Sequence, residues 1–578
     1  MVNARLRCII WVFSASLALF MGPSCRESQD RPLTAGVEPT DELAEAVASA
    51  MEEWLPDRLK ASEVPGTAAV VVGNVAIIWE KVYGVEGDPG SSPITPDTVF
   101  CIRSISKSVT TLAVLMAVQE GLLDLDTPIS EYLPDFTIRS RFDTQPEDLI
   151  TLRHMLSHWG GFTHDPPLRI NLARPNYFEQ YIGRISETWL RFPVGYRHQY
   201  SNYGFDLAGY LIQVRSGISF DEYVRREVLE PLGMAHSTFN LEVAAQIQNR
   251  AIGHDTKGKV VALPFPEIPS AGLYSSIRDM ARYVQFHLNG GIVNGQRLLR
   301  NDLMQQYHAI QFAFRDQRTG YSLGLIREVV SNTYSLYHEG GGHGFGSHMI
   351  VYPELGFGTV ILTNREYHGL TGQQARKVMN GPIINRYGPP LTPGEEFGTL
   401  RKLDLSDSRL KAILGRYGDS PGIVVGFEKG VFGMRTNKDQ FLPLDVFNDG
   451  GQLVGRYSTN KEVRFLSPYG NRPGAMMRVD RILDNYNSQY NDFNDSPLDP
   501  TGPDEPGWQK YVGEYEVLWA GESFAKANVS ITNGYLYYHD GKCEEYEPGL
   551  FFRYDGEALD FRANPPTYAN LELKKRNP

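Results

Sequence analysis

The chain has 578 residues, of which 42% are hydrophobic and 21% charged, and its formal net charge is −12 at pH 7. This length allows about two to four domains, and the composition is that of a globular protein with enough apolar residues for a large core. The acidic balance argues against nucleic acid as a partner. Beyond the N-terminal region, no stretch is apolar and long enough to predict a membrane span.

The N-terminus has the pattern of an export signal. Arg5 and Arg7 precede the apolar segment Cys8–Met21, and small residues suited to cleavage follow it, so residues 1–24 are predicted to be removed. The apolar segment is shorter than the roughly 20 residues that a membrane helix needs. Cys25 would then begin the mature chain, and its lipidation, which would tether the protein to a membrane, stays open. We expect an exported protein, either periplasmic or secreted, with a lipoprotein as the alternative.

Residues 25–45 are polar and predict a tether, after which residues 46–388 predict the first domain. A helix is expected near Glu42–Lys60. The alternating segments Thr67–Val72 and Val75–Glu80, separated by Gly and Asn, predict a β-hairpin.

Strands return at the far end of this first domain. Ser347–Tyr352 and Gly358–Leu362 predict a second hairpin around a turn at Pro353–Gly356, whereas residues 150–290 are mostly helical and loop-rich. Strands at both ends with helices between them predict an α+β domain. Its antiparallel sheet would be built from both ends of the domain, with a helical lobe inserted.

The rest of the chain predicts β structure. Short alternating segments with Gly, Asn and Asp turns divide into a linker at 389–398, a first β unit at 399–483, a second linker at 484–507 and a second β unit at 508–578. Leu414–Tyr417 and Val512–Tyr515 carry the same four-residue opening about 98 residues apart, which indicates two related units. Two small barrels and two halves of one barrel are both compatible with this pattern.

Ser104 and Lys107 stand three residues apart at the start of a long apolar helical pattern that ends near Leu122. This spacing places both side chains on the same helix face. A serine hydroxyl is a poor nucleophile until a base takes its proton, and a lysine whose pKa is lowered can act as that base. A serine before a helix can equally be an N-cap, so the case depends on motifs further along the chain.

Several further motifs follow Ser104 and Lys107 in order. They are Glu120–Asp126, Ile150–His158, Tyr200-Ser201-Asn202, Ala271–Ser276 and His338-Glu339-Gly340. With Phe100–Lys107, they resemble the serine β-lactamase and penicillin-binding-protein-like hydrolases, in particular the branch of class C β-lactamases, D-aminopeptidases and esterases. The resemblance covers roughly residues 46–385 and implies a class C β-lactamase-like α+β fold. The C-terminal units resemble lipocalin-like barrels appended to such hydrolases.

The resemblance implies an acyl-enzyme mechanism with Ser104 as the nucleophile. Lys107 and Tyr200 would act as a coupled pair, because a neighbouring ammonium favours the phenolate form of tyrosine. Asn202 would hydrogen-bond both Lys107 and a substrate amide. The backbone N–H groups of Ser104 and Gly341 would form the oxyanion hole.

The third motif of the family bears on the substrate. His338 stands where β-lactamases usually carry a lysine, and Gly340, Gly341 and His343 would border the substrate. Because histidine is mostly neutral at pH 7, a carboxylate-bearing β-lactam would gain less here. Glu339 would add negative charge if it faced the cleft, but alternation along a strand allows it to point away.

His154 and His158 are four residues apart on an expected helix, a spacing that could place both on one metal ion. A catalytic metal site usually needs three protein ligands, and no third ligand is evident in this motif. We therefore expect neither a metal nor another cofactor.

These observations predict an exported serine hydrolase that forms an acyl-enzyme on Ser104 and acts on small esters or short peptides and amides, including those with a D-residue or derived from peptidoglycan. Three alternatives stay open: a DD-carboxypeptidase or weak β-lactamase, a non-catalytic protein that binds peptidoglycan or β-lactams, and an acyltransferase. The sequence leaves the oligomeric state undetermined.

Overall fold

The computed structural model describes residues 41–576 with several gaps. The gaps are 165–176, 262–267, 313–318, 367–368, 390–401, 418–422, 436–439, 450–451, 459–460, 467–475, 482–483, 492–505, 520–521, 533, 540 and 554–555. The predicted export signal, the tether before residue 41 and Cys25 lie outside the described residues. Within the described part of the chain, no helix has the length and apolar character to cross a membrane.

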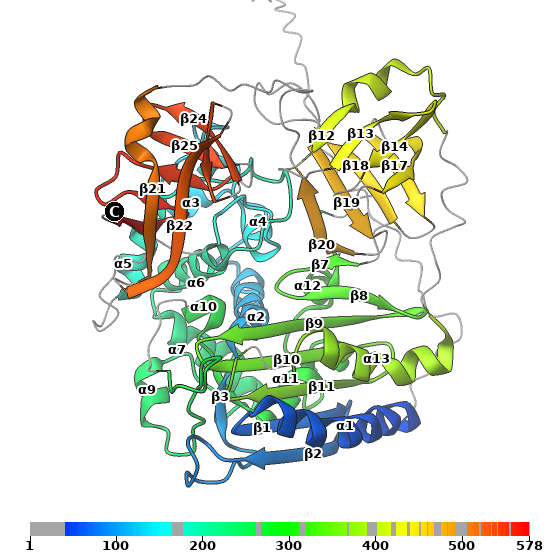
Figure 1. The fold of residues 1–578 in the computed structure, drawn as a ribbon. Coiled ribbons are helices and arrows are strands. Elements are labelled where there is room, and N and C mark those ends of the chain that lie inside the picture. The colour runs from blue at the N-terminus through cyan, green and yellow to red at the C-terminus, as the bar shows by residue number, and fades with distance from the viewer. Residues whose placement is uncertain are drawn as a thin grey trace, which may run out of the picture.

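A seven-stranded antiparallel sheet forms the base of the first domain (Figure 1). In spatial order its strands are β2 (Ile77–Gly84), β1 (Gly66–Gly73), β11 (Phe357–Thr363), β10 (Phe345–Tyr352), β9 (Thr333–Gly342), β8 (Ile326–Val330) and β7 (Gly320–Tyr321). Thr67 on β1 lies opposite Thr363 on β11, so the first hairpin joins the later strands. The prediction of an α+β sheet built from both ends of the domain is confirmed.

Helices cover both faces of this sheet. The helices α1 (Asp41–Ser62) and α13 (Gln373–Tyr387) pack on one face with Ala69 and Val71, and α11 (Ile277–Leu288) packs on the other with Val70. The alternation of β1 explains this arrangement, because successive side chains of a strand point to opposite faces and both faces here are apolar.

A helical lobe is inserted between the two groups of strands. Its helices are α2 (Ser106–Gln119), α3 (Ile129–Tyr132), α4 (Leu152–Leu156), α5 (Tyr177–Gly183), α6 (Asn202–Ser216), α7 (Phe220–Val224), α8 (Glu230–Leu232), α9 (Leu241–Gln246), α10 (Ile268–Ala271) and α12 (Asn301–His308). Two short ladders accompany them, β3 (Val99–Cys101) with β4 (Tyr274–Ser276), and β5 (Ile292–Val293) with β6 (Gln296–Arg297).

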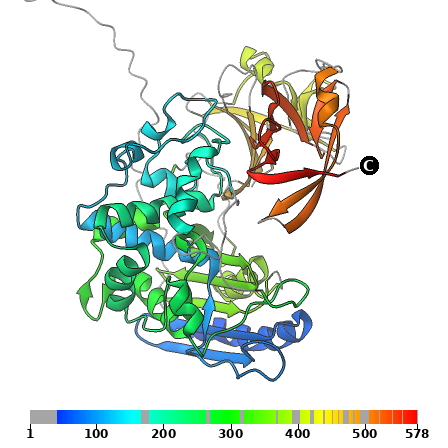
Figure 2. The same cartoon turned by 90° about the vertical axis from the view of Figure 1, so that its left-hand side faces the viewer.

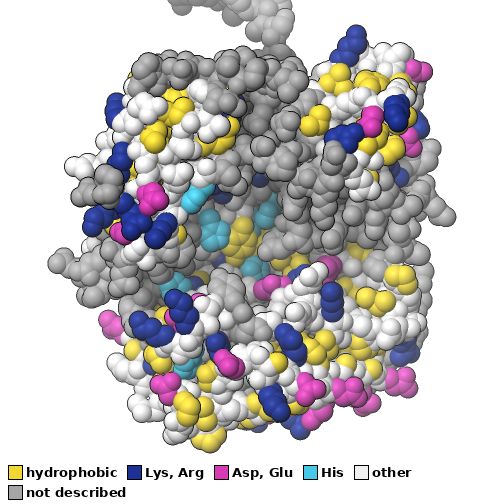
Figure 3. All heavy atoms as spheres, viewed as in Figure 1, with side chains coloured by type: hydrophobic (Ala, Val, Ile, Leu, Met, Phe, Trp, Pro, Cys, Tyr) yellow, Lys and Arg dark blue, Asp and Glu magenta, His cyan; other side chains and the backbone are white. Residues whose placement is uncertain are grey.

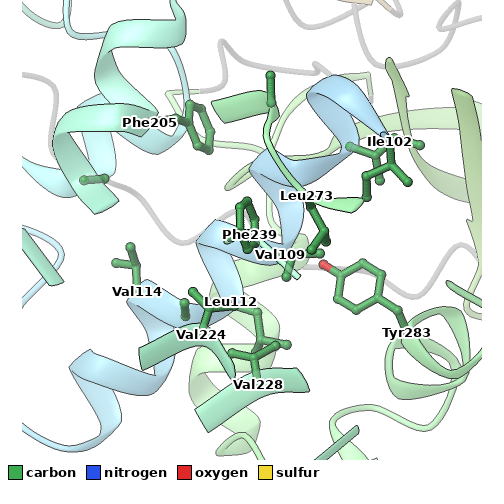
Figure 4. Packing of buried hydrophobic residues seen from close by; sticks show 14 of the residues in the cluster. Ile102, Val109, Leu112, Val114, Phe205, Val224, Val228, Phe239, Leu273 and Tyr283 are labelled. Atoms are coloured by element: carbon green, nitrogen blue, oxygen red, sulfur yellow. The ribbon is translucent and has the colours of Figure 1, made fainter. Parts of the chain in front are cut away.

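Helix α2 runs through the centre of the lobe and is buried along nearly its whole length. Figure 4 shows Val109 and Leu112 among side chains from other elements, including Phe239 and Tyr283. A helix that is apolar on all sides is stable only inside a core. The position of its N-terminus, and of the residues next to it, is therefore fixed by packing.

Replacing Leu112 with alanine should lower the free energy of unfolding of this domain by about 3 kcal/mol. Leu112 is fully buried, and truncation removes its apolar contacts and leaves a cavity in a tightly packed region. Calorimetric unfolding of the purified chain measures the change. The same substitution at the half-exposed Leu405 is the control and should cost far less.

The first C-terminal unit contains two sheets that share one apolar core. The first holds β12 (Gly415–Tyr417), β13 (Ile423–Glu428), β14 (Val431–Arg435) and β15 (Phe441–Pro443); the second holds β16 (Asp445–Asp449), β17 (Gln452–Ser458), β18 (Lys461–Leu466), β19 (Met476–Arg481) and β20 (Asp484–Asn491). Strand β20 corrects the expected linker at 484–507, because Met477 on β19 pairs with Asn491. Its polar residues lack the apolar alternation that would have indicated a strand.

The second unit is a closed barrel. Its strands are β21 (Gly513–Trp519), β22 (Glu522–Thr532), β23 (Tyr535–Tyr538), β24 (Gly541–Glu547), β25 (Leu550–Arg553), β26 (Ala558–Asp560), β27 (Thr567–Tyr568) and β28 (Leu571–Lys575). The repeated sequence opening has a structural counterpart, since a 3-10 helix precedes both β12 and β21 (Ser408–Ile413 and Pro506–Tyr511). Figures 1 and 2 show both β units at the same end of the first domain.

Candidate active site

Ser104 lies in a 3-10 turn, Arg103–Ile105, between β3 and the first residue of α2. This is slightly earlier than the first α-helical turn in which the sequence placed it. The turn is held firmly on its N-terminal side, because Ile102 N–H donates to Leu273 O at 2.9 Å and Ser347 Oγ donates to Ile102 O at 2.6 Å. Ser104 itself is partly exposed at the end of this buried segment.

Lys107 is fully buried at the start of α2, and its Nζ lies near three oxygen atoms. These are Ser104 Oγ at 3.1 Å, Asn202 Oδ1 at 2.8 Å and the carbonyl oxygen of Ser270 at 3.0 Å. A charged ammonium can donate to all three. In the neutral amine the two fixed carbonyl oxygens take its two hydrogens, and the lone pair then faces Ser104. The geometry therefore suits Lys107 to accept the Ser104 proton.

Tyr200 lies directly beside this lysine. The centre of its ring is 4.8 Å from Lys107 Nζ, and it stands two residues before Asn202, the first residue of α6. The structure thus brings together four predicted residues from two distant parts of the chain. Lys107 Nζ thus lies over the ring face of Tyr200, and the coupled titration that the sequence analysis expected of this pair stays a prediction.

His158 packs against Tyr200. Its ring centre lies 4.2 Å from that of Tyr200, and its Nδ1 accepts the backbone N–H of Ser201 at 3.0 Å. Burial, followed by the positive charges of His198 and Lys107, lowers the pKa of His158 well below its ordinary value. A neutral His158 therefore orients the Tyr200 segment.

His154 points to different partners. Its Nδ1 is 2.9 Å from Thr151 Oγ1 and its ring stacks on Phe312. Across the parts of the chain that the structure describes, no group of three or more His, Cys, Asp or Glu side chains could hold a metal ion.

Asp206 was not identified from the sequence. This buried carboxylate accepts Ser270 N–H at 2.9 Å and the Tyr181 hydroxyl at 2.7 Å, and so holds the backbone of the residue whose carbonyl contacts Lys107. Its position four residues after Asn202 in α6 was a usable signal, because residues with this spacing share a helix face. Ser270 had no comparable local signal.

His338 lies on β9 and is buried. Its Nδ1 is 2.6 Å from the Glu339 carbonyl oxygen and its Nε2 is 2.9 Å from the Tyr321 hydroxyl. A carbonyl can only accept, so Nδ1 carries the proton and Nε2 accepts from Tyr321. Burial and the nearby positive Lys107 lower the pKa of His338 to about 3, so it is neutral at pH 7.

Glu339, the next residue on β9, does not lie beside Tyr321 and Lys107 as His338 does. Its carboxylate pairs with Arg376 of α13 on the opposite face of β9, as strand alternation allowed. Burial raises its pKa, with Arg376 opposing the shift.

The remaining predicted residues lie where β9 turns into β10. A Cβ atom added to Gly340 would lie 2.4 Å from the Ile102 carbonyl oxygen, so β9 passes directly against the chain that leads to Ser104. Gly341 follows it and pairs with Gly346. His343 lies in the turn between the strands, with a φ of 48°. The oxyanion and substrate contacts expected of these residues stay predictions.

Replacing Gly340 with alanine should reduce turnover by about 100-fold, the order seen when an oxyanion donor is displaced. The added methyl group would collide with backbone, which cannot give way as a flexible side chain can, and would push β9 away from Ser104. Steady-state kinetics measure the loss. Gly426, where an added Cβ meets nothing within 4 Å, is the control site and should tolerate alanine.

Histidine and hydrophobic side chains gather in a hollow between the two β units and the hydrolase domain (Figure 3). The family model described as Beta-lactamase matches residues 45–379. The chain belongs to the beta-lactamase family. Members of this family are generally serine hydrolases.

Individual relatives of this beta-lactamase family member are distant. Protein flp of Staphylococcus aureus is 26% identical over 314 residues, which cover 53% of this chain and 61% of that protein. Beta-lactamase-like protein 2 of Dictyostelium discoideum is 29% identical over 249 residues, covering 41% of this chain and 45% of that protein. The matches thus span at most about three fifths of these curated relatives.

A solved structure shares the fold. The octameric penicillin-binding protein homologue from Pyrococcus abyssi is 22% identical, with a TM-score of 0.50, and the match covers 77% of this chain and 99% of that one. At this identity the likeness establishes the fold alone.

Proposed function

We propose that the protein hydrolyses small esters or short peptides and amides, including those with a D-residue, through an acyl-enzyme on Ser104. The observation that carries this proposal is the placement of Lys107 Nζ at 3.1 Å from Ser104 Oγ, with two carbonyl oxygens holding the amine in place. Lys107 would take the Ser104 proton as the hydroxyl attacks the carbonyl carbon. Tyr200 would then deliver a proton to the leaving group and regain one from Lys107. Water would attack the acyl carbon of the ester on Ser104, releasing the acid and restoring the serine hydroxyl.

The third motif favours neutral substrates. His338 is neutral and already bonded to Tyr321, so it offers no fixed positive charge to a substrate carboxylate. A penicillin or a peptide with a free C-terminus would gain less here than from a lysine. This supports esters and amides over DD-carboxypeptidase or β-lactamase substrates, which are the second candidate.

The proposed setting is outside the cytoplasm. It rests on the charged and apolar pattern of residues 1–24, and a membrane tether through Cys25 is part of the same proposal. Peptidoglycan-derived peptides would then be accessible substrates, and no cofactor is proposed.

The test compares the wild-type chain from Cys25 with its Ser104→Ala variant on a short-chain p-nitrophenyl ester, a D-alanine p-nitroanilide and a chromogenic cephalosporin. We expect release from the ester or the anilide by the wild type and none by the variant, with intact mass showing an acyl adduct on Ser104. Fast cephalosporin turnover would favour the second candidate. Absence of any adduct or product would contradict the proposal that the protein is an enzyme and would point to a non-catalytic binder. Transfer of the acyl group to an added alcohol or amine would show that the protein is an acyltransferase.

A further inference from the structure

One acidic side chain of the barrel reaches into the hydrolase domain. Glu557 follows the β25–β26 turn and is buried, and both of its carboxylate oxygens accept from the Thr163 hydroxyl, at 2.9 and 3.0 Å. Arg191 Nη1 lies 3.0 Å from one of these oxygens. A buried carboxylate is tolerated where it is paired and hydrogen-bonded, so this barrel residue depends on Thr163 and Arg191 of the first domain.

Thr163 and Arg191 belong to two segments that run side by side, residues 158–164 and residues 191–202. Four backbone hydrogen bonds join these segments: Arg191 N to Gly161 O at 2.8 Å, Gly195 N to Trp159 O at 2.8 Å, Gln199 N to His158 O at 2.7 Å and Asn202 N to His164 O at 3.2 Å. Glu557 touches one residue of each segment and therefore bridges them from outside.

The second segment carries two of the candidate catalytic residues, Tyr200 and Asn202. Ser201, which lies between Tyr200 and Asn202, donates its hydroxyl to Thr163 O at 2.7 Å and its N–H to His158 Nδ1 at 3.0 Å. The first segment therefore holds Ser201 at two atoms. A displacement of Thr163 would pass directly to Tyr200 and Asn202, and so to their distances from Lys107.

The barrel is seated closely enough to hold Glu557 in place. A Cβ atom added to the neighbouring Gly556 would lie 2.5 Å from the Arg191 carbonyl oxygen, so the two backbones are in direct contact. Phe552 of β25 packs edge-on against Trp189, with ring centres 5.4 Å apart, and the Arg141 guanidinium lies 4.1 Å from the Phe552 ring centre. These contacts seat Gly556 and Phe552 of the barrel against the first domain.

We infer that Glu557 is a positioning residue for the Tyr200 segment, through which the C-terminal barrel supports catalysis in the hydrolase domain. The carboxylate fixes Thr163, and Thr163 in turn fixes Ser201. This inference rests on the proposed function for its kinetic consequence. Its structural part, the ordering of residues 191–202 by the barrel, can be measured without any substrate.

The test uses the full mature chain with Glu557→Ala, Glu557→Gln and Thr163→Val. The matched control is Glu514→Gln. Glu514 is an exposed glutamate on the barrel, and its partner Arg576 belongs to the same unit. Glu557→Ala and Thr163→Val should lower kcat for the p-nitrophenyl ester by about tenfold, with KM nearly unchanged, because small misplacements of catalytic groups act on the chemical step. Amide exchange over residues 195–203 should accelerate. Glu557→Gln retains an oxygen for Thr163 and should lose less, and Glu514→Gln should match the wild type.

If the wild type is active and Glu557→Ala has an unchanged kcat, the inference is overturned. This holds even if the melting temperature of the variant falls, because a loss of stability without a loss of kcat would mean that the contact is merely structural. A wild type that does not hydrolyse the ester contradicts the proposed function instead. Exchange then decides the inference: acceleration over residues 195–203 in Glu557→Ala supports it, and unchanged exchange overturns it. If Glu557→Ala does not fold, Glu557→Gln and Thr163→Val give the same readouts.

Discussion

Replacing Lys107 with methionine should lower kcat for the p-nitrophenyl ester by about 1,000-fold, within the range expected for loss of a general base. Methionine keeps an unbranched apolar stem in this fully buried position but cannot accept a proton. Ser104 would remain in place, held by the 3-10 turn before α2. Stopped-flow measurement of the first turnover would show the loss in acylation itself.

Two further variants separate the base from its surroundings. Lys107→Arg introduces a guanidinium that stays protonated at working pH. If residue 107 must be neutral to accept the Ser104 proton, this variant should be as inactive as the methionine variant. Tyr200→Phe should lose less in acylation by an activated ester, whose leaving group needs no proton. A methionine variant within tenfold of the wild type would show that another group, Tyr200 foremost, takes the proton.

The sequence predicted much of the site because the family motifs carry it. Ser104, Lys107, Tyr200 and Asn202 come from two segments nearly a hundred residues apart, and the structure brings them together around the lysine amine. Periodicity alone could not have done so. It predicted the buried helix and the hairpins, whereas the meeting of α2 with the start of α6 is set by tertiary packing.

What the sequence could not show are the contacts that hold these residues in place. Asp206 acts through the backbone of Ser270, and His158 acts through the backbone N–H of Ser201. Every residue type has a main-chain N–H or C=O group, so the sequence does not reveal which residue supplies the main-chain partner of such a hydrogen bond. Glu557 is the extreme case, since it lies 394 positions from Thr163 in another domain.

Acidification below pH 6.5 should progressively destabilise the hydrolase domain. Four histidines, His158, His287, His338 and His348, are buried, and burial is the main reason that the pKa of each is lowered, to about 3 for His338 and His348. The unfolded chain would bind protons at these rings near pH 6.5 while the folded chain would not. Stability is therefore fully present above pH 6.5 and is lost as the pH falls toward 3.

The size of the effect follows from the same linkage. Each such ring lowers the free energy of unfolding by about 1.4 kcal/mol for every pH unit below 6.5. His338 and His348 together should therefore lower it by about 5 kcal/mol at pH 4.5, which is a large part of the stability of an ordinary domain. Melting temperature measured between pH 7.5 and 4.5 should fall steeply. His348→Leu, in a ring position packed against Tyr337, removes one titrating group and should flatten this slope. The half-exposed His236, changed to glutamine, is the control. A melting temperature independent of pH across this range would mean that the buried rings take up protons without opening the fold.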